Sequence, residues 1–172
     1  DCTSVRIIGT QALRQCTNLS EFLRLAEPAL GGPVEIISGE QEARLVYQGV
    51  QYYLPAEHKD HAVLVIDLGG ASTEFIVGQR QQIQHWRSIR LGCVDLANRF
   101  FPARHSVPVS AEALDQAYHY SCAQLQALPT DFHSGCWQLA VGASGTLRVA
   151  LELLPPSSDA SDRSVITRAD LQ

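Results

Sequence analysis

The sequence predicts an α/β domain in which a mixed β-sheet is flanked by helices. Strand patterns and helix patterns alternate along most of the 172 residues. The longest apolar run, residues 62–66, is typical of a buried strand. The pattern of residues 74–89 predicts a hairpin, because a glycine-containing turn at residues 78–82 separates two strand-like segments. Alternating elements together with a hairpin indicate α/β layering with parallel and antiparallel strands.

The first 50 residues predict strand, helix, strand and helix in that order. Residues 5–9 are a short strand candidate, and Thr10 can cap the helical turn that follows. A helix from about Ser20 ends at the Gly31-Gly32 pair, and its apolar face is formed by Phe22, Leu25, Ala26 and Ala29. Residues 34–37 form the next strand.

A capping box predicts the helix that starts after Ser38. Ser38 is the N-cap, and Gln41 is the glutamine three residues later. The apolar side of this helix is formed by Ala43, Val46, Tyr47 and Val50. Residues 62–68 then form the buried strand that leads into the hairpin.

The remaining elements are a helix at 93–101, a long helix after Ser110, a strand at 138–141 and a helix at 146–154. We expect the core side of the long helix to consist of Leu114, Ala117, Tyr118, Cys122 and Leu125. Residues 155–161 resemble a linker, and Thr167 can cap a further helix. The chain lacks Met and begins at Asp1, so we expect a fragment, with residues 1–50 ending one unit and residues 51–172 forming a second, C-terminally truncated unit.

Composition narrows the function classes. The net charge of −5 offers no global field that would attract nucleic acid, and no apolar run approaches the roughly 18 residues of a membrane span. The five cysteines are odd in number and include no C-x-x-C pair, which disfavours a disulfide framework or a zinc site. We expect five small buried side chains in a reducing, cytoplasmic environment. The oligomeric state stays open, a homodimer included.

The strongest local signal for function follows the strand at 62–68. Asp67 ends that strand, Gly69 and Gly70 let backbone N–H groups approach an anion, and the next residues supply two hydroxyls and a carboxylate, namely Ser72, Thr73 and Glu74. Two carboxylates beside one phosphate repel it unless a divalent cation lies between them. Mg²⁺ is the expected cofactor, with Asp67 and Glu74 as its acidic ligands.

A second glycine-rich turn follows the strand at 138–141 and opens a helix. Its candidate phosphate-binding residues are Gly142, Ser144, Gly145 and Thr146. A helix N-terminus carries partial positive charge where a phosphate would lie. Two such turns in one chain are characteristic of actin-like phosphotransfer folds, which are also called ribonuclease H-like or ASKHA folds.

Acidic and basic side chains supply further candidates. Glu40 and Glu42 both lie in the first turn of the predicted helix, about 200° apart at 3.6 residues per turn, so only one of them can face a cleft. The arginines available for a polyanionic substrate are Arg14, Arg87, Arg90 and Arg148.

Four segments, in this order, resemble the Ppx/GppA phosphatases: ISGEQEARLVYQGV, VIDLGGASTEF, LGCVDLANRFFP and VGASGT. The segment GTQALRQ near the start is also similar to that family. The resemblance covers residues 8–154 and implies hydrolysis of terminal phosphate from inorganic polyphosphate, or of the 5′ phosphate from guanosine pentaphosphate, as in the stringent response.

The resemblance also implies roles for single residues. Glu42 matches the catalytic base that orients and deprotonates water, and Arg14 matches an arginine beside the cleft. Asp67 and Glu74 match the magnesium-side acids, and the two glycine-rich turns match the phosphate-cradling segments. The family's first phosphate loop is absent from this sequence, so we expect the fragment alone to be inactive.

Two rival functions remain open at this point. An actin-like ATPase or sugar kinase would share both phosphate-binding turns, but it would leave the acidic helix start without a role. A non-catalytic module that binds guanosine polyphosphate would not need Glu42, Asp67 and Glu74. The sequence does not choose between polyphosphate and guanosine pentaphosphate as the substrate.

Overall fold

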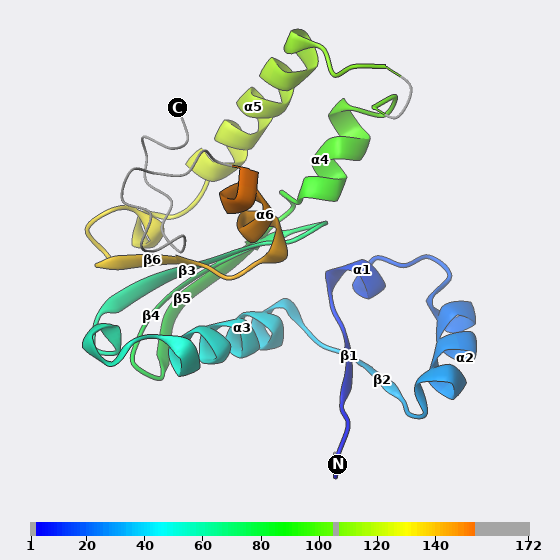
Figure 1. Cartoon of the computed structure of the whole chain (residues 1–172), viewed down its shortest axis with the longest axis horizontal. Coiled ribbons are helices and arrows are strands. Elements are labelled where there is room, and N and C mark those ends of the chain that lie inside the picture. Colours follow the sequence, from blue (N-terminus) through cyan, green and yellow to red (C-terminus); the bar gives the residue numbers. More distant parts are fainter. Residues whose placement is uncertain (1–2, 105–106, 154–172) are drawn as a thin grey trace.

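The residues described by this computed structural model, 3–104 and 107–153, form two β-sheets. The smaller sheet pairs β1 (Ile7–Gly9) with β2 (Val34–Ile36) in parallel. Helices α1 (Gln11–Arg14) and α2 (Leu19–Leu30) connect these strands, beside the larger sheet in Figure 1. No residue of α2 is buried. The apolar face of α2 therefore meets no core within the described part of the chain.

The larger sheet has the strand order β5-β4-β3-β6. Its first three strands form antiparallel pairs, and β6 runs parallel to β3. The prediction of a mixed sheet is therefore confirmed. Because β3 and β6 are parallel, the two glycine-rich turns that follow them lie at the same edge of the sheet. The strands are β3 (Ala62–Leu68), β4 (Thr73–Gln79), β5 (Gln82–Ile89) and β6 (Leu139–Gly142).

The β4–β5 hairpin contains one irregularity near its turn. Arg80 occupies the turn with a positive φ of 54°. Val77 pairs with His85 and Gly78 pairs with Ile83, so Gln84 is the extra residue of a β-bulge. Beyond the bulge, the pairing of the two strands is regular up to Ile89.

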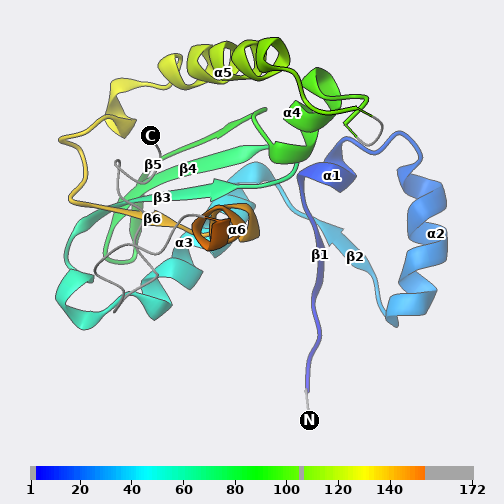
Figure 2. The ribbon, with the colours of Figure 1, turned by 45° about the horizontal axis from the view of Figure 1, so that its top comes forward.

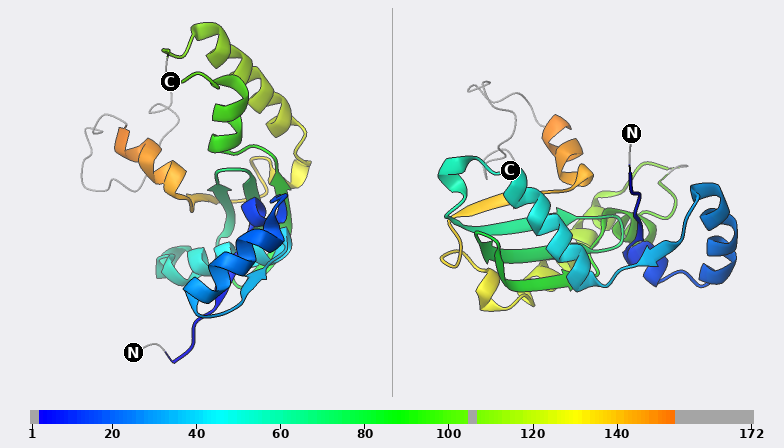
Figure 3. Two further views of the ribbon diagram at one scale, coloured as in Figure 1. Left: turned by 90° about the vertical axis from the view of Figure 1, so that its right-hand side faces the viewer. Right: turned by 90° about the horizontal axis from the view of Figure 1, so that it is seen from below.

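Helix α3 (Gly39–Tyr53) covers one face of the larger sheet, as the right-hand view of Figure 3 shows. The predicted capping box is present, with Ser38 Oγ accepting from the Gln41 amide at 3.1 Å. Buried Ala43 and Tyr47 pack into one cluster with residues of β3 and β4. The predicted boundary after residue 50 stays a prediction; α3 spans it and packs against the larger sheet.

Helices α4 (Cys93–Phe100) and α5 (Ala111–Gln126) lie on the other side of this sheet, with α5 running above the strands in Figure 2. Ser110 caps α5 as predicted. Ala117 is the one buried residue of α5. The predicted core side was wrong for Leu114, Tyr118 and Leu125, which are exposed. Phe132, from the 3-10 helix Thr130–Phe132, fills the core on this side of the sheet instead.

The last described helix is α6 (Gly145–Leu153), which follows β6. The linker at 155–161 and the cap at Thr167 fall outside the described residues. Within the described ranges, no helix is both long and apolar enough to cross a membrane.

The prediction of buried cysteines was wrong for the four that the structure describes. Cys93 and Cys136 are exposed, Cys16 and Cys122 are half-buried, and all four are free thiols. Cys2 lies outside the described residues. The cytoplasmic location and the homodimer stay predictions.

Candidate functional site

Three polar residues lie in one row across the larger sheet. The strand register pairs Asp67 with Glu74 and Glu74 with Ser88. Residues directly opposite each other in antiparallel strands share a face. This is the face that α3 covers, because Val65, two residues before Asp67, packs in the α3 cluster. The sequence predicted the two acids and missed Ser88, which the hairpin register reveals once the bulge is counted.

Glu74 is the most enclosed of these acids, with 2% of its surface exposed. Its Oε1 accepts hydrogen bonds from Ser72 Oγ at 2.7 Å and from Ser88 Oγ at 2.8 Å. Burial raises the pKa of Glu74 above its ordinary value, the two hydroxyls oppose this rise, and the charges of Glu42 and Asp67 add to it. The Glu74 carboxyl group is therefore fixed by two hydroxyl groups, and its charged form is disfavoured.

Asp67 lies half-buried beside Glu74. Burial raises its pKa, and the negative charge of Glu42 raises it further. Since Glu42 acts on both Asp67 and Glu74, the three carboxyl groups lie within electrostatic reach of one another. By contrast, Glu40 has 52% of its side chain exposed and pairs with Arg44 at 2.9 Å. Of the two acids at the start of α3, Glu42 is therefore the one that faces the site.

Glu42 is bound by Arg14, the last residue of α1. Arg14 Nη2 donates to Glu42 Oε2 at 2.9 Å, and 15% of the Glu42 side chain is exposed. Arg14 Nη1 also donates to the Ile37 carbonyl oxygen at 2.7 Å, and Nη2 donates to Gln11 Oε1 at 2.8 Å. Arg14 thus lies beside Glu42, with its guanidinium bound to protein acceptors, and its place beside a cleft stays a prediction. Gln11 was missed by the sequence reasoning.

The first glycine-rich turn is packed against the start of α4. The Gly69 amide donates to the Ser72 carbonyl oxygen at 2.9 Å. The carbonyl oxygens of Gly69 and Gly70 accept from amides of the first turn of α4 at distances of 2.9 to 3.1 Å. Ser72 and Thr73 are buried, and the Thr73 hydroxyl donates to the Leu91 carbonyl oxygen. Their predicted hydrogen bonds to phosphate stay predictions.

Gly92 allows this close packing. A Cβ placed on Gly92 would lie 2.3 Å from the Gly70 carbonyl carbon and oxygen, a distance that backbone atoms cannot accommodate. The sequence reasoning missed this glycine. Its place directly before the predicted helix at 93–101 was the available signal.

The second glycine-rich turn lies next to the first. The Ala143 amide donates to the Ile66 carbonyl oxygen at 2.9 Å, which ties this turn to β3. Ser144 Oγ accepts from the Leu147 amide at 3.2 Å, and Gly145 has open space around its Cα. Thr146 Oγ1 lies 3.6 Å from Cys93 Sγ at the start of α4. The structure thus brings the two predicted phosphate-binding turns together.

The other candidate arginines lie apart from this row. Arg148 pairs with Glu152 on the exposed side of α6 at 3.2 Å. Arg87 is exposed on β5, where Nη1 donates to the Trp86 carbonyl oxygen at 3.1 Å. Arg90, which directly follows β5, lines a separate pocket between α4 and α5.

Comparison with known proteins points to the same family that the sequence motifs resemble. The model of the Ppx/GppA phosphatase family matches residues 1–172. The crystal structure of the Aquifex aeolicus family member is 29% identical, with a TM-score of 0.63 over 86% of this chain. An exopolyphosphatase from Cytophaga hutchinsonii ATCC 33406 is 30% identical, with a TM-score of 0.71 over 86% of this chain. An exopolyphosphatase-like protein is 27% identical, with a TM-score of 0.74.

The chain spans about half the length of these relatives, 45% of the Aquifex aeolicus chain and 46% of the Cytophaga hutchinsonii chain. It has the α/β actin-like fold that the sequence predicted, as a part of the larger architecture. From the match over its whole length, we conclude that this chain belongs to the Ppx/GppA phosphatase family.

Proposed function

We propose that this chain forms part of a phosphohydrolase that removes the terminal phosphate from inorganic polyphosphate or from guanosine pentaphosphate. One observation carries the proposal: Glu42, Asp67 and Glu74 converge on one face of the sheet, at the edge where both glycine-rich turns lie. Phosphoryl transfer depends mainly on positioning and on charge stabilisation. An acidic cluster beside two such turns suits hydrolysis by water.

Glu42 is the proposed general base. A carboxylate within hydrogen-bonding reach of water can orient it for in-line attack and accept its proton. Arg14 fixes the Glu42 side chain through their 2.9 Å ion pair and is itself fixed by Gln11 and Ile37. We infer that Arg14 positions the base and that its one remaining N–H, on Nη1, can face a phosphate oxygen.

The acidic residues fit a magnesium ion that arrives with the substrate. In the described ranges, no three His, Cys, Asp or Glu side chains come together closely enough to hold an ion by themselves. Mg²⁺ typically uses one or two carboxylates, together with water and substrate phosphate oxygens. The raised pKa values of Asp67 and Glu74 indicate a cluster that a cation would stabilise. When bound, Mg²⁺ would neutralise charge on the terminal phosphate.

The proposal is tested by phosphate release in the intact protein with Glu42→Gln. We expect turnover to fall by at least about 100-fold, because the base is lost, while substrate binding is largely kept. Glu40→Gln is the matched control: it changes the same residue type two positions away, where the side chain is exposed and paired with Arg44. Wild-type turnover in Glu42→Gln would sink the assignment.

The choice of substrate in the same assay separates the rival functions. Polyphosphate, guanosine pentaphosphate and ATP are compared with and without Mg²⁺. A phosphohydrolase of the proposed kind releases phosphate from one of the first two and needs Mg²⁺. Release from ATP alone would favour an actin-like ATPase, and tight nucleotide binding without any release would favour a non-catalytic module.

A further inference from the structure

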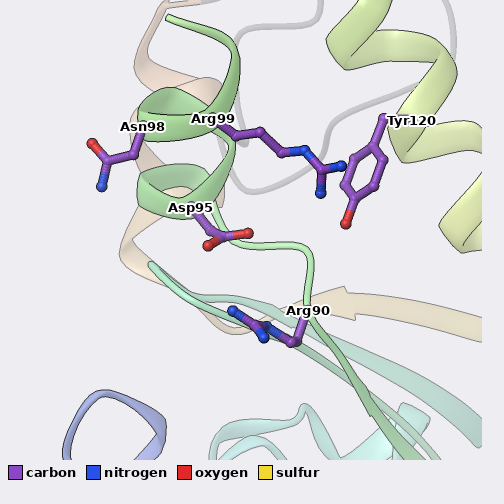
Figure 4. Close-up of a pocket in the computed structure, with 5 residues that line it drawn as sticks. All are labelled: Arg90, Asp95, Asn98, Arg99 and Tyr120. Carbon is purple, nitrogen blue, oxygen red and sulfur yellow. The ribbon is translucent and has the colours of Figure 1, made fainter. Parts of the chain in front are cut away.

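Two histidines lie together where the chain enters β3, at the opposite end of that strand from Asp67. His58 ends the 3-10 helix Ala56–His58, and His61 directly precedes β3. Both residues are half-buried, and their Nδ1 atoms lie 3.3 Å apart. Figure 4 shows the pocket between α4 and α5, and neither histidine lines it. The histidine pair is therefore separate from that pocket and from the row of carboxylates.

The two imidazole rings are poorly placed for a hydrogen bond to each other. Their Nδ1–Nδ1 distance of 3.3 Å exceeds the usual range for an N–H donor, about 2.7 to 3.2 Å. A straight hydrogen bond of that length would put the ring centres about 5.6 Å apart. The ring centres lie 5.1 Å apart, with the ring planes tilted by 38°. The two rings therefore meet at an angle and not head-on.

The same two distances are those of two imidazoles that share one tetrahedral metal ion. Zn²⁺ binds histidine nitrogens at about 2.0 to 2.1 Å, with roughly 109° between ligands. Two such nitrogens lie about 3.3 Å apart, and their ring centres lie about 5.2 Å apart. The corresponding distances between His58 and His61 are 3.3 Å and 5.1 Å. The pair therefore needs little rearrangement to chelate an ion.

Hydrogen bonds fix the segment that carries the pair. The His58 amide donates to the Pro55 carbonyl oxygen, and the His61 amide donates to the His58 carbonyl oxygen, both at 3.0 Å. Between the two histidines, the Asp60 carbonyl oxygen accepts from Gln79 Nε2 of β4 at 2.8 Å. Chelating groups that are already fixed lose less conformational freedom when the ligand arrives.

Imidazole nitrogens decide which class of metal suits the pair. They suit Zn²⁺, Cu²⁺ and Ni²⁺, whereas Mg²⁺ prefers carboxylate, carbonyl and water oxygens. The carboxylate of Asp60 is engaged in an ion pair with Arg80 at 2.9 Å. Within the described ranges, no third His, Cys, Asp or Glu completes a metal site here. Water would therefore fill the remaining coordination positions.

We propose that His58 and His61 bind a divalent transition metal ion, represented by Zn²⁺, through their Nδ1 atoms. The bound ion links the end of the 3-10 helix to the start of β3. Because it binds the paired rings of the folded chain more tightly than the separated rings of the unfolded chain, it stabilises the fold. The proposal goes beyond phosphate hydrolysis and does not depend on it.

Calorimetric titration of the intact protein with Zn²⁺, in a large excess of Mg²⁺, tests the proposal. We expect saturable binding of Zn²⁺ that Mg²⁺ does not prevent. His58→Gln and His61→Gln should each weaken it at least about tenfold, because a single imidazole cannot chelate the ion. His119→Gln is the matched control: it removes an imidazole of α5 whose side chain is 71% exposed, and it should bind Zn²⁺ like wild type.

Free thiols are the competing ligands for Zn²⁺ in this chain. Cys93 and Cys136 are exposed, so a double variant with Cys93→Ser and Cys136→Ser should keep the Zn²⁺ affinity of wild type. Nitrogen NMR gives a second measurement: Zn²⁺ should shift the Nδ1 resonances of His58 and His61 and leave those of His119 unchanged. Thermal unfolding checks the fold of each variant, and Zn²⁺ should raise the unfolding midpoint of wild type but not that of His58→Gln or His61→Gln.

Three results would overturn the inference. They are unchanged Zn²⁺ affinity in either His58→Gln or His61→Gln, loss of binding in the cysteine double variant, and absence of saturable binding in wild type. Failure of the proposed hydrolysis looks different: no substrate would be turned over, and Zn²⁺ would still bind in a histidine-dependent way.

Discussion

The two glycine-rich turns are similar in sequence but are used differently in the structure. In the first turn, carbonyl oxygens of Gly69 and Gly70 accept from α4, and the nearby hydroxyls bind protein atoms. In the second turn, Gly145 has open space around it, and the helix behind it is capped by Ser144. The first turn is thus a packed joint with α4 whose Ser72 hydroxyl binds Glu74, whereas the second is an open helix start, where we propose that an anion binds. A glycine-rich motif alone does not distinguish these roles.

The largest expected effect on stability comes from disrupting the close packing of Gly92 against the first turn. Gly92→Ala should destabilise the chain by about 3 kcal/mol, because its Cβ would overlap the Gly70 backbone. Chemical denaturation of the 172-residue chain measures this loss. Gly49→Ala is the control: it lies in α3 with open space around it, and it should be neutral or stabilising by up to about 1 kcal/mol.

A glycine-to-alanine substitution in the second turn tests the contrast between the two turns directly. If the second turn is as open as the structure shows, Gly145→Ala should leave stability nearly unchanged. A loss similar to that of Gly92→Ala would show that both turns are packed joints, and the contrast between them would fail.

A smaller effect is expected at the cap of α6. Ser144→Ala removes the oxygen that accepts from the Leu147 amide, which should cost about 1 kcal/mol of stability. In phosphate-release assays of the intact protein, the same variant should also weaken substrate binding, because the open turn loses a hydroxyl. Ser110→Ala, which removes the equivalent cap of α5 away from the carboxylates, is the control for the stability term. A variant that loses only stability would argue against contact between this hydroxyl and phosphate.

The smallest effect concerns Glu74, which accepts a hydrogen bond from Ser72 of the first turn. The pKa of Glu74 is raised in the folded chain, so the folded state keeps this proton to a higher pH than the unfolded state does. Stability contributed by Glu74 therefore falls as the pH rises from the ordinary carboxyl range through the raised pKa. Glu74→Gln should gain less than about 1 kcal/mol at neutral pH and flatten the dependence of stability on pH. Thermal unfolding across acidic to neutral pH measures both; a Glu74→Gln variant that loses stability at neutral pH would contradict the expectation.

Local signals in the sequence predicted much of the fold. The strand at residues 62–68 was predicted with the bounds that β3 has, because its continuous apolar run reflects burial on both faces. The capping box at Ser38 was predicted because its hydrogen bonds join residues only three apart. The exposed apolar side of α5 could not be predicted in the same way. Periodicity shows which residues share a helix face, but it does not show what lies against that face.

In the candidate site too, arrangements within one short segment could be predicted, whereas contacts between distant segments could not. Asp67 and Glu74 flank the turn that joins β3 to β4, so their proximity is a local property of that turn. The ion pair of Arg14 with Glu42 joins residues 28 positions apart and depends on how α1 lies against the start of α3. Ser88 required the register of β5, which the bulge at Gln84 shifts by one residue.

That bulge has a consequence for how this protein can vary. It lies at the far end of the hairpin from Glu74 and Ser88, next to the turn at Arg80. That turn is bound to the rest of the fold, because the Tyr47 hydroxyl donates to the Arg80 carbonyl oxygen at 3.1 Å and Arg80 Nε pairs with Asp60 at 2.9 Å. A change in the length of the hairpin tip would therefore break contacts with α3 and with Asp60 before it reached the row of Asp67, Glu74 and Ser88.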